Sequence, residues 1–145
     1  MITIKTKLID PDAKLPTRAH NTDAGFDLYC TRSRYNDFGF LICHSGIAIE
    51  IPEGHVGLLF PRSSIRDKDL SLTNSVGVID SGYRGEITAC FRVHPFENES
   101  VAYYEEGERF AQLIILPIPA VEFIEVEELN DNTDRGANGY GSSGK

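Results

Sequence analysis

The sequence of 145 residues contains no tryptophan, a single methionine and no long apolar run. A membrane-spanning helix is therefore not expected, since such a helix needs about 20 consecutive, mostly apolar residues. Basic residues are also scarce: 14 Lys and Arg stand against 22 Asp and Glu, a formal net charge of −8. This charge argues against a protein that coats nucleic acid, because such binding depends on Lys and Arg side chains that neutralise phosphates. We expect a soluble protein, cytoplasmic or otherwise intracellular, that binds neither nucleic acid nor membrane.

Cysteine is infrequent too, with Cys30, Cys43 and Cys90 in an odd number and without CxxC spacing. The four histidines are not spaced as zinc ligands, either among themselves or with the cysteines. The first residues alternate in polarity and lack the apolar core of a signal peptide. We therefore expect reduced thiols that fill the core rather than bind metal.

A period of two residues dominates the apolar pattern and predicts β-strands. It occurs at Ile2 and Ile4, over residues 47–51, over residues 87–93, and at Val121 and Phe123. Turn-forming residues recur at short intervals, and no stretch sustains the period of an amphipathic helix. The pattern predicts one all-β domain, which could be a sandwich, a jelly roll or a barrel.

The last part of the chain changes composition twice. Residues 122–134 contain six acids, and residues 135–145 are rich in glycine. Gly139 to Lys145 resembles the start of a phosphate-binding loop, but no Ser or Thr and no helix follow, so that identity is rejected. The segment is interpreted either as a disordered tail or as a mobile lid whose backbone N–H groups, with Arg135, wrap a phosphate.

Two further segments carry candidate chemistry. Residues 74–85 deliver Asp80 from an apolar run into a Ser-Gly turn, where it either caps the turn or takes a proton from water at the mouth of a pocket. Residues 61–64 follow the apolar run 56–60, and Arg62 there has the planar fork of donors that suits phosphate oxygens. A solvated turn is the alternative for this second segment.

Together, and in order, five segments resemble the motifs of the trimeric deoxyuridine triphosphatase (dUTPase) family. They are Ala24-Gly25-Phe26-Asp27-Leu28, Pro61-Arg62-Ser63-Ser64, residues 74–85, residues 108–113, and residues 135–144. The resemblance implies a β jelly-roll domain over residues 1–134 and an active-site arm over residues 135–145. It also implies a homotrimer with shared active sites that hydrolyses dUTP to dUMP and pyrophosphate, with Mg²⁺ as cofactor. This activity keeps uracil out of DNA and supplies dUMP for thymidylate synthesis.

The resemblance also implies a role for individual residues. Asp80 matches the general base that activates the attacking water, and Tyr83 matches the ring that packs under deoxyribose. Asn74 matches the hairpin that reads uracil, and Asp27 matches an acid near the phosphates and Mg²⁺, which is held mainly by phosphates and water. The other implied substrate-binding residues are Arg62, Ser63, Ser64, Gly77, Val78, Ile79, Gln112, Arg135, Gly139, Tyr140, Gly141 and Ser142.

Two rival functions remain from the sequence. A dCTP deaminase of the related branch would need a Glu on the strand after Asp80, where residues 87–91 have none and Glu86 comes too early. A non-catalytic jelly-roll module that binds nucleotide or regulates a partner is the second alternative. The presence of Asp80 and of the complete arm motif argues against this loss of catalysis.

Overall fold

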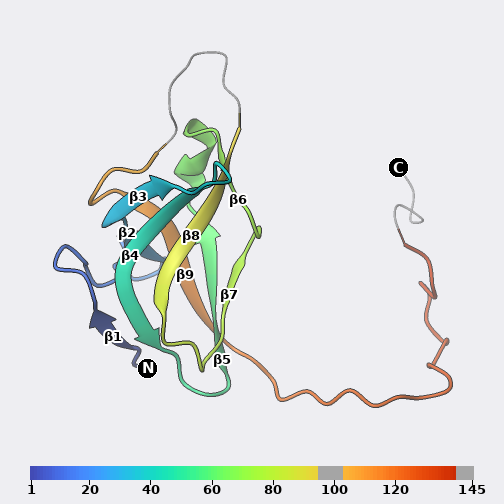
Figure 1. The fold of residues 1–145 in the computed structure, drawn as a ribbon. Helices are drawn as coiled ribbons and strands as arrows, with labels where there is room; N and C mark the ends of the chain where they lie inside the picture. The colour runs from blue at the N-terminus through green and yellow to red at the C-terminus, as the bar shows by residue number, and fades with distance from the viewer. Residues whose placement is uncertain (95–102, 140–145) are drawn as a thin grey trace.

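The computed structural model describes residues 1–94 and 103–139, and these residues form two antiparallel β-sheets (Figure 1). The strands are β1 (Lys5–Leu8), β2 (Phe26–Tyr29), β3 (Arg32–Tyr35), β4 (Leu41–Glu50), β5 (His55–Pro61), β6 (Leu70–Leu72), β7 (Gly77–Ile79), β8 (Glu86–Val93) and β9 (Arg109–Pro117). One short 3₁₀ helix, η1 (Ser63–Asp67), follows β5. No helix of the described residues is long and apolar enough to cross a membrane. The predicted all-β jelly roll is confirmed.

The sheets differ in size and in strand order. The larger sheet has the order β1-β4-β8-β6, and β3 also pairs with β4. The smaller sheet has the order β2-β9-β5-β7, so β2 and β7 form its two edges. Sequence neighbours therefore end up in different sheets, as β6 and β7 do, and the turns between them lie where the sheets meet.

The core lies between the sheets, and the alternating apolar side chains of the strands fill it. In β8, Ile87, Ala89 and Phe91 are buried while the residues between them are not. Phe91, Tyr104 and Phe110 form an aromatic row, with ring centroids 5.5 and 6.2 Å apart. Burial raises the pKa of the Tyr104 hydroxyl. The strand predictions over residues 47–51 and 87–93 are confirmed, as part of β4 and β8.

The predictions at the two ends of the chain are wrong. The first strand begins at Lys5, after Ile2 and Ile4. Val121 and Phe123 belong to no strand, and the chain from residue 118 to residue 139 runs away from both sheets (Figure 1). The Phe123 side chain is 96% exposed. A strand needs a neighbour that accepts and donates its backbone hydrogen bonds, and among the described residues none pairs in this way with Val121 or Phe123.

The cysteines follow the prediction in two cases of three. Cys30 and Cys43 are buried in the core as free thiols. A hydrogen bond from the Cys43 thiol lowers the pKa of Cys30 and raises that of Cys43. Cys90 differs, because it is only partly buried and faces a surface pocket.

Candidate functional site

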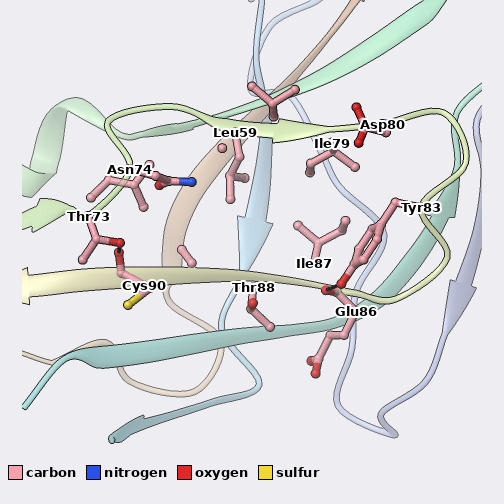
Figure 2. A pocket seen from close by; sticks show the side chains of 14 residues that line it. Leu59, Thr73, Asn74, Ile79, Asp80, Tyr83, Glu86, Ile87, Thr88 and Cys90 are labelled. Carbon is pink, nitrogen blue, oxygen red and sulfur yellow. Dashed lines mark hydrogen bonds between the residues drawn. The ribbon is translucent and has the colours of Figure 1, made fainter. Parts of the chain in front are cut away.

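A pocket of about 350 Å³ lies between β7, at the edge of the smaller sheet, and β8 of the larger sheet (Figure 2). We call it the Asp80 pocket. Its lining residues are Leu59, Leu72, Thr73, Asn74, Gly77, Val78, Ile79, Asp80, Tyr83, Glu86, Ile87, Thr88, Ala89 and Cys90. The pocket thus collects Asn74, residues 77–80 and Tyr83 of the segment 74–85 that the sequence singled out, together with residues 86–90 of β8.

The turn between β6 and β7 places Asn74 at one end of this pocket. Ser75 adopts a positive φ of 61°, and its N–H donates to the carbonyl of Leu72 at 3.1 Å. This tight turn directs the Asn74 amide, which can donate and accept, toward the pocket (Figure 2). Glycine suits position 77, because a Cβ there would lie only 3.1 Å from Cβ of Leu59 on the neighbouring strand.

The turn after β7 places Asp80 and Tyr83 at the other end. The N–H of Tyr83 donates to the Asp80 carbonyl at 3.0 Å, and the Tyr83 hydroxyl donates to the Glu86 carbonyl at 3.1 Å. Gly85 is needed here, since a Cβ on it would overlap the Tyr83 hydroxyl. Asp80 is exposed, and no described residue donates a hydrogen bond to its carboxylate. This carboxylate is therefore free to accept a proton from water.

A second, more polar pocket of about 320 Å³ lies around Asp27 of β2. We call it the Asp27 pocket. It is lined by Ala19, Asp23, Ala24, Gly25, Asp27, Arg62, Ser63, Arg109 and Gln112. Oδ1 of Asp27 accepts from Nε of Arg62 at 2.7 Å, and Oδ2 accepts from Nη1 of Arg109 at 3.0 Å. Two guanidinium groups are thereby fixed side by side, and their remaining N–H groups can bind an anion.

Glycine also shapes this second pocket. A Cβ on Gly25 would overlap Oε1 of Gln112, so only glycine leaves room for the amide of Gln112. Nε2 of Gln112 donates to the carbonyl of Pro61 at 3.0 Å, which ties β9 to the end of β5. Nη1 of Arg62 lies 3.4 Å from Oγ of Ser64. The first, second and fourth motif segments therefore meet at one place.

Arg109 is a residue of this pocket that the sequence analysis did not select. A regular strand would place it on the face opposite Gln112, because the two residues are an odd number of positions apart. The pairing of β2 with β9 shifts register, however, from Leu28 opposite Ala111 to Tyr29 opposite Arg109. The irregularity brings Arg109 to Asp27. A charged residue within the fourth motif segment was the available signal.

The two pockets share no residue and lie far apart in one chain. Gly57 of β5 is opposite Ile79, the neighbour of Asp80, whereas Arg62 follows Gly57 by five residues at the other end of β5. Five residues of strand correspond to about 17 Å. A single chain therefore does not bring the predicted general base to the predicted phosphate-binding residues.

The described part of the arm, residues 135–139, lines neither pocket. Arg135 makes a local contact, from its Nε to the carbonyl of Asn138 at 3.0 Å, and Gly139 is exposed. Tyr140, Gly141 and Ser142 lie outside the described residues.

The described side chains offer few ligands for the expected Mg²⁺. No group of three or more His, Cys, Asp or Glu side chains among residues 1–94 and 103–139 is arranged to hold a metal. Asp27 supplies one carboxylate, and each of its oxygens already accepts from an arginine. Such a site fits Mg²⁺ that keeps its waters and is bound mainly through substrate phosphates.

Comparison with known proteins gives a consistent result. The dUTPase family model matches residues 11–144. A deoxyuridine 5'-triphosphate nucleotidohydrolase of Corynebacterium glutamicum is 44% identical, over all of this chain and 97% of that protein. One of Nocardia farcinica is 43% identical, over 97% of this chain and 85% of that protein.

Solved structures agree with the sequence comparison. The dUTPase of Staphylococcus bacteriophage 80alpha, in a structure with dUpNHpp, is 33% identical over the full length of both chains, with a TM-score of 0.85. A mutant dUTPase of the S. aureus phage phi11 is 28% identical, over 88% of this chain and 98% of that chain, with a TM-score of 0.74. The chain belongs to the dUTPase family.

Proposed function

We propose that this protein hydrolyses dUTP to dUMP and pyrophosphate. The observation that carries the proposal is the Asp80 pocket, which presents an exposed carboxylate beside the Tyr83 ring and opposite the Asn74 amide (Figure 2). The amide can contact a base, the ring a sugar, and the carboxylate the water that attacks the phosphorus. The relatives are named for this reaction, and the phage 80alpha structure contains dUpNHpp.

In the proposed mechanism Asp80 takes a proton from a water molecule as that water attacks the α-phosphorus. The carboxylate is suited to this step because no described residue occupies it and it lies at the open mouth of the pocket. Backbone groups of Gly77, Val78 and Ile79 line the pocket near Asn74 and can read the edge of uracil. A site of this kind rejects the wrong base strongly, because its polar groups would stay unpaired.

The Asp27 pocket supplies the contacts to the phosphates in this proposal. Arg62, Ser63, Ser64 and Gln112 are the predicted residues, and Arg109 joins them. A Mg²⁺ ion bound to the triphosphate would neutralise charge that develops on the phosphates. Asp27 keeps the two arginines in place, since each of its oxygens accepts from a guanidinium group.

We propose further that the active site is completed by other copies of the chain, in a homotrimer. The separation of about 17 Å along β5 supports this, because base and phosphate residues must act on one substrate. The extended segment 118–139 also supports it, since its apolar side chains Val121, Phe123 and Ile124 are exposed in the single chain. In this assembly residues 135–145, including Arg135, Gly139, Tyr140, Gly141 and Ser142, form an arm that closes over a neighbour's site and excludes water.

The test is pyrophosphate release from dUTP, dCTP, dTTP and UTP in separate incubations, each with Mg²⁺ and with a chelator in its place. We expect release from dUTP alone and only with Mg²⁺. Ammonia from dCTP would move the protein to the deaminase branch, and inactivity on all four would leave a binding module.

The deaminase alternative is not favoured. Glu86 precedes the stretch where that chemistry would need an acid, and its carboxylate contacts Gly46 and His44 on β4. In Figure 2 this side chain points away from Asp80 and Asn74.

A further inference from the structure

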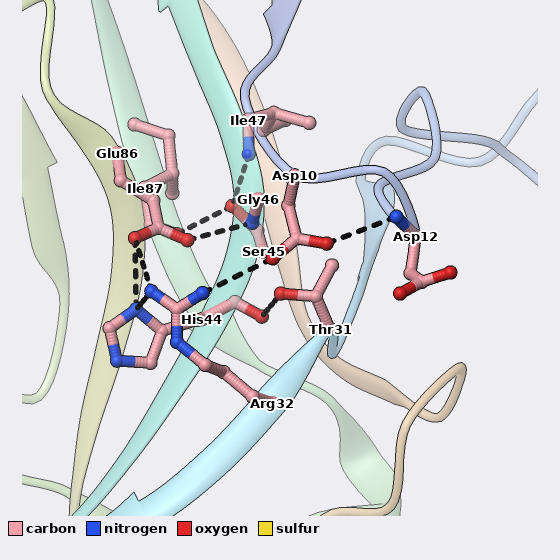
Figure 3. Close-up of polar contacts among 10 residues, drawn as sticks. All are labelled: Asp10, Asp12, Thr31, Arg32, His44, Ser45, Gly46, Ile47, Glu86 and Ile87. Carbon is pink, nitrogen blue, oxygen red and sulfur yellow. Dashed lines mark hydrogen bonds and ion pairs between the residues drawn. The ribbon is translucent and has the colours of Figure 1, made fainter.

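A polar cluster lies behind the Asp80 pocket, between β8, β4 and the start of the chain (Figure 3). We call it the Glu86 cluster, and it consists of Asp10, Arg32, His44, Gly46 and Glu86. Oε1 of Glu86 accepts from the Gly46 N–H at 2.8 Å, and Oε2 lies 2.9 Å from Nδ1 of His44 and 3.5 Å from Nη2 of Arg32. Nη1 of Arg32 in turn donates to Asp10 at 3.1 Å. His44 is buried, and the carboxylates of Asp10 and Glu86 are largely so.

The cluster is located where the backbone pairing of β4 with β8 is interrupted. The pairs run regularly to His44 opposite Thr88, and the register then shifts before Ala48 pairs with Glu86. Gly46 lies in this interruption, and its N–H finds its acceptor in the Glu86 carboxylate. The side chain therefore takes the place of a missing ladder bond and holds the first residue of β8 against β4.

The other end of Glu86 forms part of the pocket. Its backbone carbonyl accepts from the Tyr83 hydroxyl at 3.1 Å, and this is the hydrogen bond that fixes the tip of the ring. Tyr83 is 47% exposed, so packing alone holds it weakly. Glu86 thus contacts the polar cluster through its side chain and the Tyr83 hydroxyl through its backbone carbonyl.

We infer that Glu86 is a positioning residue for Tyr83, and that through Tyr83 it determines how strictly the pocket rejects a ribonucleotide. The inference rests on the proposed function of the Asp80 pocket. A ring excludes a 2′-hydroxyl only by lying close to the sugar, and a displacement of about 1 Å is enough to weaken such a geometric effect. Loss of the Glu86 carboxylate removes one of the contacts that hold the start of β8, beside its backbone pairing with Ala48, and so loosens the carbonyl to which Tyr83 is bound.

The experiment compares the affinities of dUMP and UMP by calorimetry for the wild type, Glu86→Ala and Glu86→Gln. The control is Glu50→Gln, which removes the charge of an exposed ion pair with Lys5 on the same sheet. We expect Glu86→Ala to reduce the preference for dUMP over UMP by roughly tenfold, the scale of one misplaced contact. Glu86→Gln keeps an acceptor for the Gly46 N–H and should lose less, whereas the control should keep the wild-type preference.

A purely structural role gives a different result. It would lower the melting temperature of the Glu86 variants while the ratio of the two affinities stayed at the wild-type value, and this would overturn the inference. Tyr83→Phe keeps the ring and removes the hydroxyl, so it tests the same link if Glu86→Ala does not fold; an unchanged ratio there would also refute it. Wild-type protein that prefers dUMP but releases no pyrophosphate from dUTP would instead contradict the proposed function alone.

Discussion

Asp80, the proposed general base, can be tested by a single substitution. Its carboxylate is exposed and accepts from no described residue, so its replacement by an amide should leave the pocket intact. We predict that Asp80→Asn binds dUMP nearly as the wild type does and lowers turnover of dUTP by roughly 10²-fold or more. Steady-state kinetics and calorimetry measure the two effects. Near-normal turnover would refute the role of Asp80, and Glu50→Gln serves again as the control.

Arg109 offers a second test at this scale, because Asp27 fixes it beside Arg62. We predict that Arg109→Gln raises KM for dUTP by roughly tenfold, since it removes one charged donor from the phosphates. Affinity for deoxyuridine, which lacks phosphate, should not change. Arg66→Gln is the matched control, because Arg66 is exposed and, in the part of the chain that the structure describes, forms an ion pair only with Asp67. An equal effect of both substitutions would show that overall charge, not the Asp27 pocket, is responsible.

Cys90 makes the pocket accessible to a chemical probe. It is the least buried of the three cysteines and lines the Asp80 pocket, while Cys30 and Cys43 are 1% and 0% exposed. We predict that a thiol reagent modifies Cys90 first in the native protein and that dUMP slows this modification. Mass spectrometry identifies the labelled residue. Labelling that dUMP does not affect would place the nucleotide elsewhere.

Among the strands, the sequence pattern predicted the regular segments but not the register shifts that interrupt their pairing. The period of two located β8, which buries every second side chain, and the second half of β4, where Ile47 and Ile49 alternate into the same core. The register shifts opposite Arg109 and after His44 have no such signature. These irregularities change which face a side chain occupies, and the pattern alone therefore hid Arg109 and the Glu86 cluster.

Gly46 combines a left-handed backbone conformation with close neighbours. Its φ is +65°, and a Cβ would lie 2.6 Å from Cβ of Asp10 and 2.9 Å from Cβ of Ala13. Gly54 has a similar φ of +74° with nothing within 4 Å of its Cβ position. Gly54→Ala should cost about 1 kcal/mol through conformation alone, and Gly46→Ala at least roughly 2 kcal/mol more through overlap. Urea unfolding at equal protein concentration compares them, and equal losses would contradict the crowding at Gly46.

For the whole molecule, a single chain leaves the Asp80 pocket and the Asp27 pocket apart. Sequence motifs named residues of both pockets, yet they could not tell that Asp80 and Arg62 lie at opposite ends of β5. Val121 and Phe123 were predicted to lie in a strand, but they belong to none, and their side chains are exposed in the single chain. Periodicity describes how one chain folds, whereas the active site of the proposed trimer would depend on how several chains meet.

If the active site is shared between chains, mixed trimers of two inactive variants should regain activity. Asp80→Asn protein lacks the base, and protein without residues 135–145 lacks the arm, so each alone should have little activity. If the arm serves a neighbour's site, chains refolded together in equal amounts should regain activity in about a quarter of the sites, since each such site combines an intact base with an intact arm from different chains. If every arm serves its own chain, no site is complete and nothing is regained. Pyrophosphate release, with native mass spectrometry to verify that mixed trimers form, distinguishes the two arrangements.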